Sequence, residues 1–170
     1  MKVSEIMSHR LFTCSEDDSL HRAAQLMWEQ DIGCVPVVKG TRVVGILTDR
    51  DICMSAYLNG KPLAQLRTSD VMSRDIRACG PNDDVNVAEE RMAKAQVHRL
   101  PVIENESLIG LIALNDLAVA GATKNQPRLD QVGATLAQIC RRRTGDGVST
   151  QQDASGSLAS ITQATGLRYV

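Results

Sequence analysis

The chain contains an internal repeat, and this constrains its fold more than any other feature of the sequence. Residues 4–53 align with residues 69–118 at a shift of 65 without a gap, and eleven of the fifty positions are identical. Average composition would give roughly three identities by chance. The identical pairs are Ser4/Ser69, Met7/Met72, Ser8/Ser73, Cys14/Cys79, Asp18/Asp83, Ala23/Ala88, Met27/Met92, Pro36/Pro101, Val37/Val102, Gly45/Gly110 and Asp51/Asp116. The sequence therefore predicts two copies of one structural unit.

Each copy opens its core with an amphipathic helix. Ser19 is a predicted N-cap, and apolar residues then recur at helical spacing as far as about Gln30. Two branched apolar runs follow, at 34–38 and 42–47, with a tight turn between them. The second copy repeats this pattern, and in both copies a short helix begins after the second strand. The predicted unit is β-α-β-β-α, preceded by a short helical turn at 4–7 or 69–72.

One such unit is too small to bury its sheet and its short helix alone. We therefore expect an α+β fold, resembling an α/β sandwich, in which two repeats pack with pseudo-two-fold symmetry and form two equivalent clefts. The predicted boundaries are 1–60 for the first repeat, 61–121 for the second, 122–143 for a C-terminal helical extension and 144–170 for a disordered tail. The helix of the extension is expected between Pro127 and Arg143.

Composition argues against several functional classes. The net charge of −1 provides no broad attraction for nucleic acid, and the three arginines at 141–143 would give only weak, salt-sensitive binding. The five cysteines form no C-x-x-C pair, which indicates reduced thiols and no structural zinc. The N-terminus lacks the pattern of a secretion signal, and no apolar run is long enough to span a bilayer, so we expect a cytoplasmic protein.

The strongest local motif lies at a strand-to-helix junction in each copy. It reads Gly-Ile-Leu-Thr-Asp-Arg-Asp at 45–51 and Gly-Leu-Ile-Ala-Leu-Asn-Asp at 110–116. In the first helical turn, Asp51 or Asp116 could accept hydrogen bonds from a ribose diol, while exposed backbone amides there favour an anion. A capping box between Thr48 and Asp51 is the structural alternative. Ala113 cannot cap in the same way, which favours a further role for the aspartates.

These residues resemble the CBS domain pair, or Bateman module, of the stand-alone bacterial type. The resemblance covers residues 1 to about 120. It includes the duplicated frame, the turns Glu5-Ile6-Met7 and Asp70-Val71-Met72, the strand prolines Pro36 and Pro101, and the final aspartate of each motif. It implies a regulatory protein that is not an enzyme and that binds AMP, ADP, ATP, S-adenosylmethionine or NADH in the clefts between repeats. No metal or covalent cofactor is implied.

The resemblance also implies roles for individual residues. Asp51 would hold the ribose in one cleft and Asp116 in the other, and adenine would lie mainly against the backbone of the first-strand region of the opposite repeat. The His-Arg pair at 98–99 resembles the phosphate-facing pair in the regulatory subunit of AMP-activated kinase, although an exposed strand start is the plain alternative. The implied ligand-binding set is Thr13, Cys14, Thr48, Arg50, Asp51, Ala78, Cys79, His98, Arg99, Pro101, Asn115 and Asp116. We also expect the thiols of Cys14 and Cys79 to line the two clefts.

The first copy departs from this pattern, because Gly33 and Cys34 stand where the second has the His-Arg pair. No catalytic constellation is visible. The predicted function is allosteric sensing of an adenosyl ligand by a homodimer, which in the family often forms a flat disc through its helices, acting on a regulated protein that the sequence does not identify. The alternative is a ligand-free scaffold that docks a partner through the C-terminal tail or the helix near 129–140.

Overall fold

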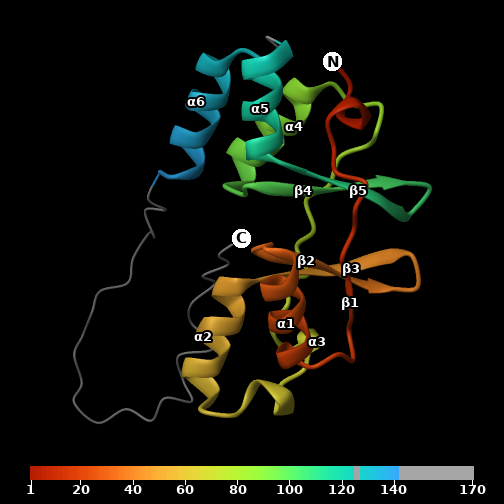
Figure 1. Ribbon diagram of the computed structural model, residues 1–170, viewed down its shortest axis with the longest axis vertical. Coiled ribbons are helices and arrows are strands. Elements are labelled where there is room, and N and C mark those ends of the chain that lie inside the picture. Colours follow the sequence, from red (N-terminus) through yellow and green to blue (C-terminus); the bar gives the residue numbers. More distant parts are fainter. Residues whose placement is uncertain (125–126, 142–170) are drawn as a thin grey trace.

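The two repeats are stacked one on the other in the computed structural model, which describes residues 1–124 and 127–141 (Figure 1). Repeat 1 contains β1 (Cys14–Ser15), α1 (Leu20–Gln30), β2 (Cys34–Lys39), β3 (Arg42–Thr48) and α2 (Asp49–Asn59), and repeat 2 contains α4 (Val85–Ala95), β4 (Arg99–Glu104), β5 (Ser107–Ala113) and α5 (Leu114–Lys124). This confirms the α+β fold predicted from the repeat.

The sheets of the two repeats pair their strands in the same way. β2 and β3 are antiparallel, as are β4 and β5, and the register shifts at equivalent places, between Val37 and Val38 and between Val102 and Ile103. β1 runs parallel to β2, whereas its counterpart in repeat 2 is reduced to a single bridge from Cys79 to Val102. Repeat 2 therefore has a two-stranded sheet instead of the three strands expected.

The helices begin and end as their cap residues dictate. The Ser19 hydroxyl accepts a hydrogen bond from Arg22 N at 3.2 Å, which confirms the predicted cap of α1, and Asp84 caps α4 through Asn86 N. α1 ends at Asp31 and α4 at Gln96, each with left-handed backbone (φ 52° and 55°). Both helices bury one apolar face against their own sheet, as the sequence pattern predicts.

Each repeat also packs with a short segment that precedes the other repeat. The turn η1 (Val3–Glu5) joins the core of repeat 2, and Val3 N donates to Asp83 O. The turn η2 (Leu63–Gln65) and helix α3 (Thr68–Val71) lie against repeat 1. Met7 contacts Gly110, and Met72 contacts Gly45. Because a side chain on either glycine would collide with its methionine, these contacts explain why all four residues are identical between the copies.

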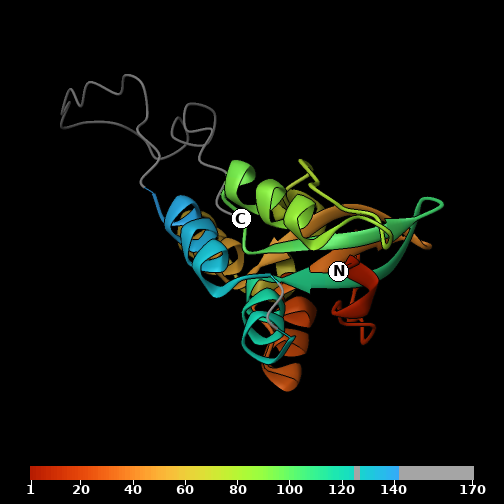
Figure 2. The same ribbon diagram turned by 90° about the horizontal axis from the view of Figure 1, so that it is seen from above.

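Helix α6 (Leu129–Ile139) packs against both α4 and α5 and is shorter than the helix predicted between Pro127 and Arg143 (Figure 2). The side-chain amide of Gln96 donates to three backbone carbonyls at its end, those of Gln138, Ile139 and Arg141. The predicted tail 144–170 lies outside the described residues. Within the part of the chain that the structure describes, no helix has the length and apolar character needed to cross a membrane.

Candidate ligand cleft between the repeats

Asp116 opens on a cleft of about 280 Å³ to which both repeats contribute. Repeat 1 supplies Arg10, Phe12 and Asp31 to its wall, and repeat 2 supplies Arg99 and Asn115 beside Asp116. The cleft therefore combines carboxylates, guanidinium groups and one aromatic ring. The structure brings together three residues of the expected set here, Arg99, Asn115 and Asp116.

The first turn of α5 positions the Asp116 carboxylate. Its Oδ2 accepts a hydrogen bond from Ala113 N at 2.8 Å, and among the described residues Oδ1 accepts none. Burial raises the pKa of this half-buried carboxyl, and the positive charge of Arg99 opposes that rise. Asp116 therefore lies at the cleft with one oxygen able to accept hydrogen bonds from a ligand.

Asp51 has the same place in repeat 1 but different partners. The Thr48 hydroxyl donates to Asp51 Oδ2 at 2.7 Å and accepts from Asp51 N, and Thr48 N donates to the same oxygen at 2.9 Å. This is the capping box that the sequence left as an alternative. Burial raises the pKa of Asp51, and the Thr48 hydrogen bonds lower it. The neighbouring Arg50 is exposed on α2.

Arg99 lies at the boundary between the repeats. A Cβ atom on residue 33, which is glycine, would lie 3.6 Å from Arg99 Nη2 and 3.3 Å from Asp49 Oδ2. Burial raises the pKa of the adjacent Cys34 thiol, and the charge of Arg99 lowers it. The Arg99 guanidinium thus lies beside repeat 1 while the same residue lines the cleft of Asp116.

Arg10 and Phe12 complete the cleft, and the sequence reasoning missed both as ligand residues. The Arg10 guanidinium lies 4.9 Å from the centre of the Phe12 ring, and its Nη2 donates to Gln30 Oε1. A signal was present in the sequence. Phe12 is the single phenylalanine of the chain, and its repeat-equivalent is Arg77, so this position is one where the two copies differ sharply.

The expected contacts of the first-strand regions are only partly present. Thr13 is exposed. The thiols of Cys14 and Cys79 are buried in the cores of their own repeats, where burial raises the pKa of each to about 11. This corrects the expectation that they line the clefts, because β1 and its counterpart turn these side chains inward. Only backbone atoms of these two residues remain as possible ligand contacts.

Three further residues of the expected set lie outside the cleft of Asp116. His98 is exposed, and its carbonyl accepts from Leu114 N. Pro101 is a buried strand residue whose carbonyl accepts from Cys79 N. Ala78 lines a separate hollow of about 520 Å³, where the charged residues Arg77, Arg91 and Lys94 gather. That hollow is basic, whereas the cleft of Asp116 carries charges of both signs.

No group of three or more His, Cys, Asp or Glu side chains suited to a metal ion occurs among residues 1–124 and 127–141. The carboxylate of Asp116 and the guanidinium groups of Arg10 and Arg99 can hydrogen-bond an organic ligand that has hydroxyl groups and a negatively charged part.

Comparison with known proteins identifies the repeats. The CBS domain family model matches residues 3–56 and 69–122. The chain is 34% identical over 137 residues to the CBS domain-containing protein YhcV of Bacillus subtilis, a match that covers 81% of this chain and 94% of the relative. Among solved structures, the CBS-domain containing protein ATU1752 of Agrobacterium tumefaciens superposes with a TM-score of 0.65 at 27% identity, covering 71% of this chain and 98% of that one.

The CBS domain pair of protein MJ0100, in complex with 5'-methylthioadenosine and S-adenosyl-L-methionine, has a TM-score of 0.66 at 22% identity and covers 73% of this chain and 98% of its own. At that identity the likeness shows a common fold. Two matched repeats share the order helix, two antiparallel strands, helix, and lead to one conclusion: the chain belongs to the CBS domain family and carries two CBS domains in tandem.

Proposed function

We propose that this CBS pair is a regulatory module that binds an adenine nucleotide, or a related adenosyl ligand, in the cleft of Asp116. The observation that carries the proposal is the half-buried Asp116 carboxylate, which faces a cleft built by both repeats and keeps one oxygen without a hydrogen bond from the described residues. An adenosyl ligand in the MJ0100 pair, which shares the fold, supports this choice of ligand class.

The groups around the cleft match the parts of a nucleotide. Ionised Asp116 can accept hydrogen bonds from the two ribose hydroxyls. Arg99 and Arg10 can donate to phosphate oxygens, and an exposed edge or face of Phe12 can contact a base. His98 stays a candidate second phosphate donor, which would require its exposed side chain to turn toward the cleft.

The cleft of Asp116 is proposed as the first site, ahead of the cleft of Asp51. Both aspartates keep Oδ1 without a hydrogen bond from the described residues, because the bonds between Asp51 and Thr48 use only Oδ2 and the Asp51 amide. The walls of the Asp116 cleft decide the order, since both repeats contribute to them and they carry Arg10, Arg99 and Phe12.

Regulation follows from where the ligand would bind. A ligand that touches both repeats can favour one relative arrangement of them, provided that its affinity differs between the two arrangements. The changed surface would be read by a protein partner, and a homodimer is part of the proposal. No catalytic step is proposed.

The test is thermal unfolding of the purified protein with AMP, ADP, ATP, S-adenosylmethionine, NADH and, as a control, GTP. A ligand at about 100 times its dissociation constant stabilises by roughly 2.7 kcal/mol, a rise in Tm of about 5 to 11 °C. The rise should disappear in Asp116→Asn and persist in the matched variant Asp51→Asn. Loss in Asp51→Asn alone would move the site to the other cleft, and no rise with any adenosyl compound would refute ligand sensing and leave the ligand-free scaffold.

Substitution of Arg99 tests whether a bound ligand uses a negatively charged group such as phosphate. If the ligand carries phosphate, Arg99→Ala should weaken ATP or AMP binding at least about tenfold, because each lost charged hydrogen bond is worth roughly 1.5–3 kcal/mol. S-adenosylmethionine has no phosphate, but its α-carboxylate can also pair with a guanidinium. Adenosine, which has no anionic group, is therefore the control that should bind equally well to both proteins. Equal ATP affinity in wild type and Arg99→Ala would remove the phosphate role from this residue.

A further inference from the structure

Helix α6 packs on α4 and α5, and it is not part of either CBS domain. The second match to the family model ends at residue 122, whereas α6 begins at Leu129. In repeat 1 the corresponding place, between α1 and α2, is an open hollow lined by residues that include Ala24, Met27 and Ile52. The surface of α4 and α5 under α6, called the α6 seat below, therefore accommodates a helix, and α6 is its occupant in this structure.

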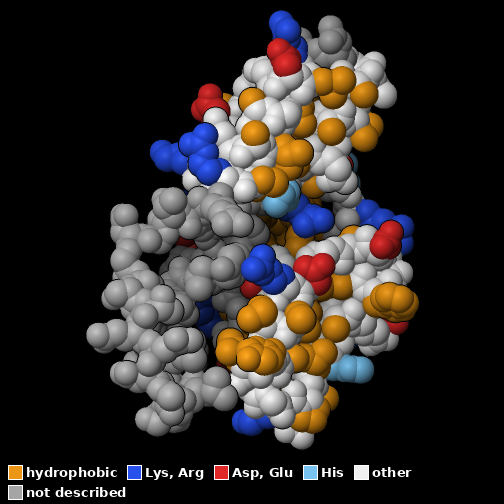
Figure 3. Space-filling view, turned by 90° about the vertical axis from the view of Figure 1, so that its left-hand side faces the viewer, with side chains coloured by type: hydrophobic (Ala, Val, Ile, Leu, Met, Phe, Trp, Pro, Cys, Tyr) orange, Lys and Arg blue, Asp and Glu red, His pale blue; other side chains and the backbone are white. Residues whose placement is uncertain are grey.

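Only part of the apolar surface of α6 contacts this seat. The buried residues of the helix are Val132, Thr135 and Ile139, whereas Leu129 and Leu136 are 54% and 44% exposed. Figure 3 looks onto this side of the molecule, and apolar side chains are visible in its upper half, where repeat 2 lies. A helix of eleven residues is marginal in isolation. The packing of α6 on its seat therefore supplies most of its stability.

The α6 seat contains a buried carboxyl group that lacks a partner. Glu89, on α4, has the position that Ala24 has in repeat 1, where Ala24 lines the open hollow. Glu89 is only 4% exposed, and its Oε1 has no hydrogen-bond partner among the described residues. None of the ion pairs within that part of the chain includes Glu89. An acidic group thus lies buried on the face that α6 covers.

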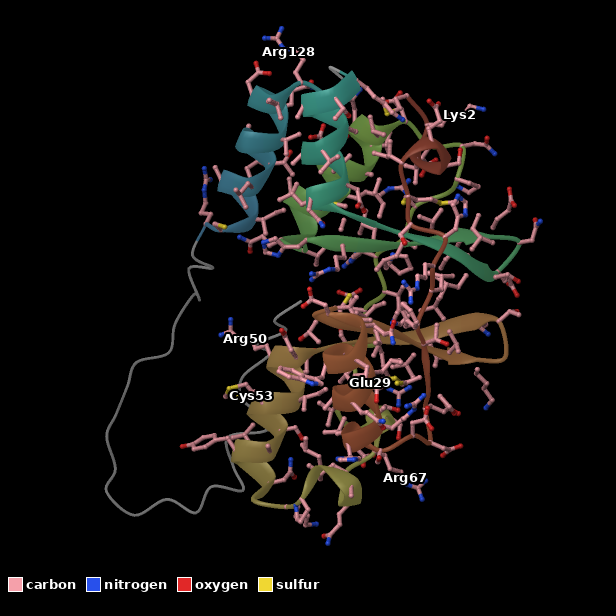
Figure 4. The ribbon with its side chains drawn as sticks, viewed as in Figure 1. Lys2, Glu29, Arg50, Cys53, Arg67 and Arg128 are labelled. Carbon is pink, nitrogen blue, oxygen red and sulfur yellow. The ribbon has the colours of Figure 1, made fainter. Side chains whose placement is uncertain are left out.

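Helix α6 supplies no positive charge to Glu89. Its one charged residue is Asp130. Arg128, which precedes the helix, projects outward from the N-terminal end of α6 (Figure 4), and its Nε donates to Asp130 Oδ1 at 3.0 Å. A buried acceptor without a donor is destabilising, and lysine and arginine form the strongest hydrogen bonds to a carboxylate. A helix with the same apolar face and one basic residue toward Glu89 would therefore fit the seat better than α6 does.

We propose that the α6 seat is a docking surface for an amphipathic helix of another protein, that this helix carries a lysine or arginine facing Glu89, and that it binds by displacing α6. The partner helix would have apolar residues at the spacing of 132, 135 and 139 in α6. As a tethered competitor, α6 would exclude helices that lack the complementary charge. This surface is separate from the cleft of Asp116, so the proposal goes beyond the proposed function and does not rest on it.

Position 135 is where a basic residue on α6 would reach Glu89. The two helices run in the same direction (Figure 1), and the ends of α4 and α6 meet where Gln96 donates to carbonyls of α6. Glu89 precedes Gln96 by about two helical turns, which corresponds to the level of Val132 on α6. Helical side chains lean toward the N-terminus of their helix. A lysine at Thr135, about one turn later, would therefore point to that level.

Two lysine variants of the full chain test the role of Glu89. Thr135→Lys places the charge on the buried face of α6, and Ala137→Lys places the same charge on its exposed face. Amide exchange in α6 should be at least about tenfold slower in Thr135→Lys than in Ala137→Lys, because a hydrogen bond to a charged group contributes about that factor. The difference should vanish when both variants also carry Glu89→Gln. Equal or faster exchange in Thr135→Lys would overturn the selection of a basic helix.

Labelled peptides that span residues 127–141 test displacement in the wild-type protein. By fluorescence anisotropy, the peptide with Thr135→Lys should bind at least about tenfold more tightly than the peptide with Ala137→Lys, and Glu89→Gln protein should lose this preference. Saturation with the first peptide should also quicken amide exchange in α6 of the protein. Unchanged exchange at saturation would place the peptide elsewhere and overturn the proposal. Absence of binding at about 1 mM, the order of effective concentration of a tethered helix, would overturn it as well.

Discussion

Gly121, on α5, allows the start of α6 to approach α5 closely, and a substitution at this position tests whether the packing of α6 depends on that approach. A Cβ at this position would lie 2.6 Å from the Pro127 carbonyl oxygen and 3.1 Å from Leu129 Cδ2. Ordinary contact begins at 3.4 Å, so the start of α6 would have to move by about 0.8 Å (3.4 minus 2.6). Overpacking of this kind typically costs about 1–3 kcal/mol. Gly121→Ala should therefore loosen α6 from α5.

Gly133 provides the control, because Ala also favours helices over Gly. It lies inside α6, and a Cβ there would meet none of the described residues within 4 Å. Gly133→Ala should therefore gain roughly 0.5–1 kcal/mol from helix propensity alone. Since both changes carry the same propensity gain, the difference between them isolates the contact with Pro127.

Calorimetry of the two variants measures that difference. With about 2–4 °C per kcal/mol for a chain of this size, Gly133→Ala should raise Tm by roughly 1–4 °C, and Gly121→Ala should melt roughly 2–12 °C below Gly133→Ala. Amide exchange in α6 should also quicken in Gly121→Ala. Equal Tm values for the two variants would refute the reasoning, because they would mean that α6 does not depend on a close approach at Gly121.

Three further outcomes are expected. Thr48→Ala should lower the free energy of unfolding by about 1 kcal/mol in urea titrations, since it removes the capping box of α2; an unchanged midpoint would contradict this. The buried Glu89 has no hydrogen-bond partner for Oε1 within the described part of the chain, and burial raises its pKa above the ordinary 4.5. The folded protein therefore keeps the Glu89 proton at pH values where the unfolded chain has already lost it. As pH rises above 4.5, the free energy of unfolding falls until Glu89 also ionises in the folded protein. Glu89→Gln, which cannot ionise, should be more stable than wild type by roughly 1 kcal/mol near pH 7 and equally stable near pH 4. A thiol reagent near pH 8 should modify the exposed Cys53 and Cys140 rapidly. The buried cysteines should react only when the protein unfolds, and these are Cys14, Cys34 and Cys79. Equal reaction rates for all five thiols would contradict the burial.

Local features were predictable where a few neighbouring residues decide the structure. The cap at Ser19 and the two strands of the hairpin could be predicted from residue spacing and turn residues. The capping box at Thr48 could also be predicted, because its partner Asp51 lies three residues further along the chain. Because the two copies align without a gap, the helices and hairpin predicted for the first copy also predicted those of the second. The same apolar pattern in both copies favours the same helix and hairpin packing.

The cleft was harder to predict because it is assembled from segments distant in the sequence. Asp116 and Arg99 were found through their motifs. Arg10 and Phe12 reach the same cleft from the first repeat, and the one signal for them was the difference between Phe12 and its repeat-equivalent Arg77. The inward orientation of Cys14 depends on its parallel pairing with Val37, which links residues far apart. Side-chain direction in a two-residue strand is a property of that pairing and is invisible to residue type alone.

The cleft of Asp116 and the outer face of repeat 1 share a wall. Asp31 and Ile32, at the left-handed end of α1, line the cleft on one side and a hollow of about 650 Å³ between α1 and α2 on the other. Under the proposed function, a ligand that shifts these residues in the cleft also reshapes the outer face of repeat 1. Thermodynamic linkage then requires the reverse effect, so a partner bound to that face must change ligand affinity by the same factor. In repeat 2, Gln96, the counterpart of Asp31, instead donates its side-chain amide to backbone carbonyls at the end of α6. Because α6 packs on α4 and α5, we expect the ligand-dependent change to be read at the helices of repeat 1.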